Sequence, residues 1–136
     1  GDRIYFYYNG TRALHHSERR APRPDQGIGV CWIRRDGFLG YWGPSRRSGM
    51  VTTAPLIFDQ GRELVVNAET TSDSGEMWVE VVGDDRFGPS KCVPFRSNQI
   101  DGLIRWNKAH FGELKGRPVQ LRFHLHGARL DAFEVR

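Results

Sequence analysis

Residues 119–126 alternate apolar and polar side chains without a break, and this pattern constrains the fold more than any other feature of the chain. The apolar set is Val119, Leu121, Phe123 and Leu125, and the polar set is Gln120, Arg122, His124 and His126. A period of two is typical of a β-strand with one face buried and the other in water. We therefore predict a half-buried strand whose polar face carries an arginine and two histidines.

The residues that follow predict a partner for this strand. Gly127 and Ala128 turn the chain into a last strand-like run, residues 129–136. We expect the two runs to form either a C-terminal hairpin or a pair that crosses from one sheet to another. Either arrangement would close a β-sandwich.

The beginning of the chain predicts a second pair of strands. Residues 3–10 are rich in aromatic residues and end in Asn9-Gly10, and residues 27–35 form a second apolar run. The intervening segment, residues 11–26, lacks periodicity, so we expect a long loop. We expect the two strands to pair antiparallel, the second being mostly buried, although two strands alone cannot bury both faces.

From residue 38 onward, short apolar runs recur about every ten residues between turn signals. We expect strands near residues 38–42, 50–53, 56–58, 64–69, 76–82 and 102–106. Alternation places Leu64, Val66, Ala68, Met77, Val79 and Val81 inward. The predicted fold is all-β, a two-sheet antiparallel β-sandwich of jelly-roll type, with residues 1–36 as an N-terminal hairpin and loop and residues 37–136 as the sandwich.

Composition limits the classes of function. The chain has 136 residues and a formal net charge of +4, but its basic residues are interleaved with acids and accompany no recognition motif, so we expect no nucleic-acid partner. No apolar run in the sequence approaches the length of a membrane helix, so we expect no membrane partner, and we expect the first strand to begin without a signal peptide in residues 1–3. Cys31 and Cys92 are the two cysteines. They are compatible with one disulfide across the sandwich or with two buried free thiols.

The best candidate site is a polar sheet face that carries one tryptophan. Trp78 lies on the parity opposite the buried residues of its run and can serve as a stacking platform for a sugar ring. The other candidates are Asn67, Glu80, Arg122 and His124, with Glu69 and His126 on the same parity. The competing interpretation is a solvated face, or one packed against another domain. Tyr41, Trp42 and Trp106 are alternative platforms.

The sequence gives little support for a metal or catalytic centre, and we expect no cofactor. No third metal ligand stands at a suitable spacing from His15-His16 or from the pair His124 and His126. Asp73 or Asp84-Asp85 could supply oxygen ligands to calcium, but no calcium-binding loop motif surrounds them. No nucleophile elbow surrounds a serine, and a Glu69–Glu80 carboxylate pair would need the two strands to be neighbours.

The order of the motifs resembles a known family. Residues 33–38 (IRRDGF), 51–56 (VTTAPL), 64–68 (LVVNA), 78–81 (WVEV) and 116–125 (GRPVQLRFHL) are similar to the C-terminal region of bacterial five-bladed-propeller glycoside hydrolases related to invertase, levanase and arabinanase. The resemblance covers nearly the whole chain. It implies the end of a last propeller blade followed by an accessory β-sandwich, with the catalytic carboxylates in earlier blades.

The resemblance also sets the functional expectations. It implies a non-catalytic, carbohydrate-binding sandwich of a secreted or periplasmic enzyme, with a polysaccharide or oligosaccharide and the catalytic propeller of the parent protein as partners. One alternative is a structural module that docks on the propeller without binding sugar. Another is that Tyr7, Tyr8, Asn9 and the loop to Gln26 complete the rim of the parent active site.

Overall fold

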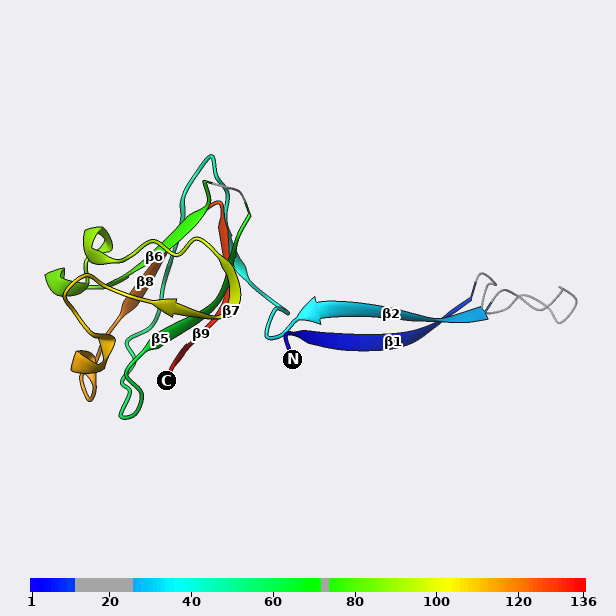
Figure 1. Ribbon diagram of the computed structural model, residues 1–136, viewed down its shortest axis with the longest axis horizontal. Helices are drawn as coiled ribbons and strands as arrows, with labels where there is room; N and C mark the ends of the chain where they lie inside the picture. Colours follow the sequence, from blue (N-terminus) through cyan, green and yellow to red (C-terminus); the bar gives the residue numbers. More distant parts are fainter. Residues whose placement is uncertain (12–25, 72–73) are drawn as a thin grey trace, which may run out of the picture. The chain divides into compact units, whose positions relative to one another are not determined.

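The computed structural model describes residues 1–11, 26–71 and 74–136, and they form an all-β protein (Figure 1). The chain divides into two compact units, Gly1–Arg35 and Asp36–Arg136. The first unit is a hairpin, and the second is a β-sandwich of two antiparallel sheets. The predicted fold class is confirmed. Within the described ranges, no helix is long and apolar enough to span a membrane.

The hairpin pairs β1 (Arg3–Thr11) with β2 (Gln26–Arg34) in an uninterrupted antiparallel register. One face presents Tyr5 and Tyr7 beside Trp32 and Val30, and the guanidinium of Arg3 lies 3.9 Å from the centre of the Trp32 ring. The prediction that β2 is mostly buried is wrong, because Ile28 is 84% exposed and Trp32 52% exposed. Apolar composition indicates a strand, but burial also requires a covering layer, and two strands provide none.

In residues 36–71 and 74–136, seven strands build the sandwich, and their hydrogen bonding defines two sheets. The first sheet has the order β3-β9-β5-β7 and contains β3 (Tyr41–Gly43), β9 (Ala128–Val135), β5 (Leu64–Thr70) and β7 (Asn98–Ile104). The second has the order β4-β8-β6 and contains β4 (Gly49–Thr52), β8 (Leu121–His126) and β6 (Glu76–Val81). β8 and β9 therefore belong to different sheets, so the C-terminal pair crosses between sheets and is not a hairpin.

The core between the sheets follows the predicted alternation. The inward residues of β5, β6 and β8 are fully or almost fully buried: Leu64, Val66, Ala68, Met77, Val79, Val81, Leu121, Phe123 and Leu125. Trp106, just beyond β7, is also buried, and its indole donates a 3.0 Å hydrogen bond to the carbonyl of Val79 on β6. Because β7 and β6 are in different sheets, this bond joins the two layers.

Where the structure describes the connections between strands, they contain three short 3₁₀ helices, Asp85–Phe87, Pro89–Lys91 and Phe111–Leu114. In the last of these, the Phe111 ring stacks on Phe58 at 5.0 Å. The predicted strand at residues 56–58 does not form, since only Leu56 makes an isolated bridge, to Val119. Pro55, next to it, cannot donate to a ladder, which explains the interruption.

Candidate functional site

The outer face of the β4-β8-β6 sheet brings several predicted site residues together. The register aligns Met50 with His124 and Trp78 in one row across the three strands, and Thr52 with Arg122 and Glu80 in the next. His126 lies opposite Glu76 in a third row. We refer to these eight residues, Met50, Thr52, Glu76, Trp78, Glu80, Arg122, His124 and His126, as the Trp78 face.

The rings of a tryptophan and a histidine stack against each other in the middle of this face. The rings of Trp78 and His124 are stacked, 5.4 Å between centroids and 7° from parallel. The Trp78 indole is partly buried and packs against the core, which restricts its motion. Met50 continues the row on β4 and is 62% exposed. A sugar ring stacks on a surface of this kind through its C–H groups.

Glu80 organises the polar groups beside the aromatic pair. Its Oε1 atom accepts from Arg122 Nη1 at 2.9 Å and lies 3.2 Å from His124 Nε2. Arg122 Nε also donates to Thr52 Oγ1 at 3.1 Å. A guanidinium has five N–H donors, so these two bonds leave three for other partners. Within the part of the chain that the structure describes, Glu80 Oε2 also has no partner, so a donor group and an acceptor oxygen lie side by side.

Not every predicted residue belongs to this face. Asn67 and Glu69 lie on β5, in the other sheet, so the prediction that they share a face with Trp78 is wrong. Asn67 is only 4% exposed, which rules out direct contact with a ligand. Glu69 lies near Arg129 and Asn98, and it cannot form a carboxylate pair with Glu80 across neighbouring strands.

The alternative platforms separate into a core residue and two surface residues. Trp106 is buried between Phe87 and Phe111, at centroid distances of 5.3 and 5.7 Å, and is structural. Tyr41 and Trp42 are more than half exposed on β3, which belongs to the other sheet. Sequence analysis missed Met50 and Thr52, because their place beside β8 depends on strand pairing and not on any local pattern.

The weaker candidates gain no support from their surroundings. No group of three His, Cys, Asp or Glu residues that could hold a metal occurs in residues 1–11, 26–71 and 74–136. His15-His16 and Asp73 lie outside the described residues. Asp84 caps the first 3₁₀ helix and binds the Arg86 side chain at 2.8 Å, and this hydrogen bonding lowers the pKa of Asp84.

Both cysteines are free thiols, so the disulfide alternative does not hold. Cys92 is buried, and desolvation raises its pKa to about 11. Cys31 is exposed on β2, so the alternative of two buried thiols is also wrong.

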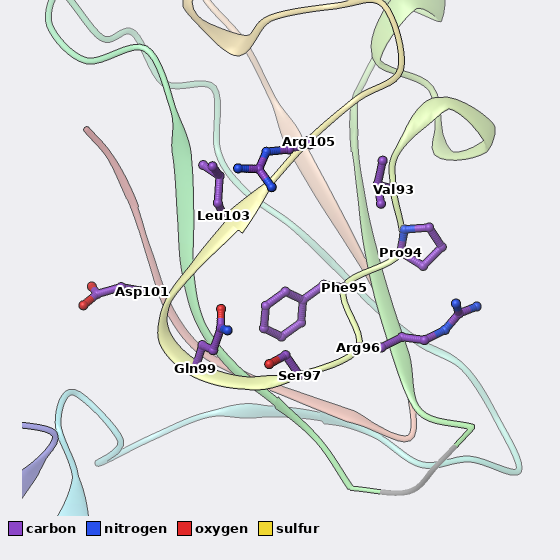
Figure 2. Close-up of a pocket in the computed structure, with 9 residues that line it drawn as sticks. All are labelled: Val93, Pro94, Phe95, Arg96, Ser97, Gln99, Asp101, Leu103 and Arg105. Carbon is purple, nitrogen blue, oxygen red and sulfur yellow. The ribbon is translucent and has the colours of Figure 1, made fainter.

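A second feature, unnoticed in the sequence, is a groove of about 360 Å³ between β7 and residues 93–97. We refer to it as the β7 groove. Figure 2 shows Phe95 at its centre, Leu103 and Arg105 from the β7 side at one end, and Ser97 and Gln99 at the other.

Comparison with known proteins assigns the chain to no family, since no family model, curated protein or solved structure matches it.

Proposed function

We propose that this chain is a non-catalytic carbohydrate-binding region of a secreted or periplasmic glycoside hydrolase, and that the Trp78 face binds the glycan. The observation that carries the proposal is the Trp78–His124 stack next to the Glu80–Arg122 pair. The aromatic row would contact the apolar side of a sugar ring. The free Arg122 N–H groups and Glu80 Oε2 would then bind two adjacent hydroxyls.

Preorganisation supports this assignment over a merely solvated face. Arg122 is fixed by Thr52 and Glu80, and His124 is fixed by Glu80 and by the Trp78 ring. Side chains that are already held lose little conformational entropy on binding. The resemblance to the accessory sandwich of the invertase, levanase and arabinanase relatives supplies the parent class, and with it fructans and arabinans as the first glycans to test.

The test is native affinity electrophoresis in gels containing levan, arabinan, xylan or polygalacturonate, at low and at moderate salt. We expect retardation by a neutral glycan that persists in salt, and its loss in Trp78→Ala. Trp42→Ala is the matched control, because it removes a half-exposed tryptophan from the other sheet. Arg122→Ala should weaken binding at least about tenfold, the cost of a hydrogen bond to a charged group.

Two outcomes would contradict the proposal. Unchanged retardation of Trp78→Ala would exclude the Trp78 face, and retardation only by polygalacturonate that disappears with salt would indicate the exposed arginines instead. Circular dichroism of each variant distinguishes loss of binding from loss of fold.

The second candidate function is a structural module that docks on the catalytic propeller. One observation favours it: the β1–β2 hairpin exposes aromatic and aliphatic side chains on both faces, among them Ile28 at 84% on one face and Tyr8 at 55% on the other. Large exposed apolar patches mark interaction surfaces. Absence of retardation by any neutral or anionic glycan would favour this function, as would restored hydrolysis when the chain is mixed with the rest of the enzyme.

A further inference from the structure

The β7 groove exists because two neighbouring segments, residues 91–93 and 105–107, separate after two hydrogen bonds, the first from the amide of Asn107 to the carbonyl of Lys91. The amide of Val93 donates to the carbonyl of Arg105 at 2.8 Å, which closes one end of the groove. Two residues later the chain turns toward the other sheet, where Phe95 exchanges two hydrogen bonds with Met77 on β6. The space left between residues 93–97 and β7 is the groove seen in Figure 2.

The β7 side of this space carries backbone groups that have no partner. β7 is an edge strand of its sheet, paired with β5 on one side only. The Arg105 carbonyl points away from β5, toward Val93, and the pairing with β5 is regular from Ile104 to Gly102. Because backbone groups alternate in direction along an antiparallel strand, the N–H and C=O of Leu103 also point away from β5. Among the described residues, neither has a hydrogen-bond partner.

The segment opposite β7, residues 93–97, also contains backbone groups without a backbone hydrogen-bond partner. Phe95 directs its own N–H and C=O to Met77. Within the described part of the chain, neither the Pro94 carbonyl nor the Arg96 amide, on either side of Phe95, is hydrogen-bonded to another backbone group. Backbone groups without a backbone partner therefore occur in both segments that border the groove, and on the β7 side they belong to a regular strand.

The side chains of the groove favour an acidic occupant. The Arg105 guanidinium is exposed and takes part in no ion pair or hydrogen bond among the described residues, whereas Arg96 is held by Glu76 at 2.6 Å. The Asp101 carboxylate binds Arg136 at 2.8 Å, so it does not neutralise Arg105. Leu103, Pro94 and the half-exposed Val93 supply apolar surface beside the free charge.

The floor of the groove argues against a sugar as its ligand. Phe95 is only 8% exposed, and its ring lies where a Cβ on Gly102 would stand. The ring is packed into the protein and does not present a face for stacking. Backbone groups at strand spacing are instead what an extended peptide uses when it adds to a sheet edge.

We propose that the β7 groove binds an extended, acidic peptide segment of another protein, which adds to β7 as a strand and places a carboxylate on Arg105. The segment would pair with the N–H and C=O of Leu103. This site is separate from the Trp78 face, and neither proposal depends on the other.

The experiment measures binding of a fluorescein-labelled peptide, acetyl-Thr-Val-Glu-Val-Thr-Val-amide, to the full chain by fluorescence polarisation. A peptide with Lys in place of Glu and one with alternate amides N-methylated serve as ligand controls. We expect binding of the Glu peptide alone, with affinity at least about tenfold lower for Arg105→Ala and unchanged for Arg47→Ala, an exposed arginine in a turn.

Leu103→Pro tests the backbone contact directly. This substitution removes an N–H that faces the groove and not the β5 ladder, and proline is tolerated at such edge positions. We expect the variant to fold and to lose peptide binding. Undiminished binding by Leu103→Pro, equal binding of the Lys peptide, or no binding of the Glu peptide by the unaltered chain would each overturn the proposal. Binding of galacturonate oligomers in place of peptide would assign the groove to an anionic sugar.

Discussion

Replacing Trp106 with Phe should destabilise the sandwich strongly, because one atom of this side chain joins the two sheets. The indole Nε1 donates to the Val79 carbonyl at 3.0 Å, and both residues are buried. Phenylalanine keeps an aromatic ring against Phe111 but removes the donor, which leaves the Val79 carbonyl without that partner. An unsatisfied buried polar group costs about 1–3 kcal/mol.

The smaller ring adds a packing loss to the lost hydrogen bond. Trp106 is 6% exposed and contacts Phe87 and Phe111, so its missing ring atoms would leave a void. At about 0.8 kcal/mol per buried methylene equivalent, the loss is roughly 1–2 kcal/mol. The total, about 2–5 kcal/mol, corresponds to a fall in Tm of roughly 8–20 °C for a domain of about this size.

The assay is urea unfolding followed by tryptophan fluorescence and far-ultraviolet circular dichroism, with thermal unfolding in parallel. Trp42→Phe is the matched control. It alters an indole that is 51% exposed on β3 and should change the free energy of unfolding by no more than about 0.5 kcal/mol. Equal stability of the two variants would refute the idea that the Trp106–Val79 bond holds the layers together.

Three further predictions concern glycine, acid sensitivity and thiol reactivity. Gly43→Ala should destabilise by roughly 1–3 kcal/mol in urea unfolding, because its Cβ would lie 2.3 Å from the backbone oxygen of Leu125, whereas Gly88→Ala, with 3.4 Å of clearance, should be nearly neutral. The Arg86 guanidinium lowers the pKa of Asp84 below its unfolded value, so the stability this pair contributes is present above about pH 4 and is lost as pH falls through the folded pKa. The difference in unfolding free energy between the unaltered chain and Asp84→Asn should therefore shrink between about pH 5 and pH 2, and a constant difference would contradict the pairing. At about pH 8, iodoacetamide should modify the exposed thiol of Cys31 in the folded chain and modify Cys92 only after unfolding, because burial raises the pKa of Cys92 to about 11. Mass spectrometry measures both rates, and equal rates at the two thiols in the folded chain would contradict the burial of Cys92.

The sequence predicted which face of β6 and of β8 is buried, because that information is local. Val79 and Phe123 are inward, and Trp78 and His124 outward, as alternation requires. It could not predict which strands are neighbours. Asn67 has the same outward parity as Trp78 but lies in the other sheet, and no periodicity distinguishes the two cases.

The β7 groove was beyond prediction for another reason. Its distinguishing groups are backbone atoms of Pro94, Arg96 and Leu103, and backbone atoms leave no trace in a side-chain pattern. Their lack of partners results from the hydrogen bonding of Phe95 to Met77, a tertiary contact between segments that are distant in sequence. The exposure of Ile28 could not be predicted either, because the composition of a strand does not indicate whether another layer of the protein covers it.

The positions of β8 and β9 determine when this domain can fold during its own synthesis. β8 is the middle strand of one sheet, β9 lies between β3 and β5 in the other, and a single glycine, Gly127 with φ of +53°, connects them. A nascent chain that ends before residue 121 lacks the strand against which β4 and β6 pair and the strand against which β3 pairs. The ribosome must therefore release residues 121–135 from its exit tunnel before either sheet can be completed, so β3, β4 and β6 lack their partner strands until that point in translation.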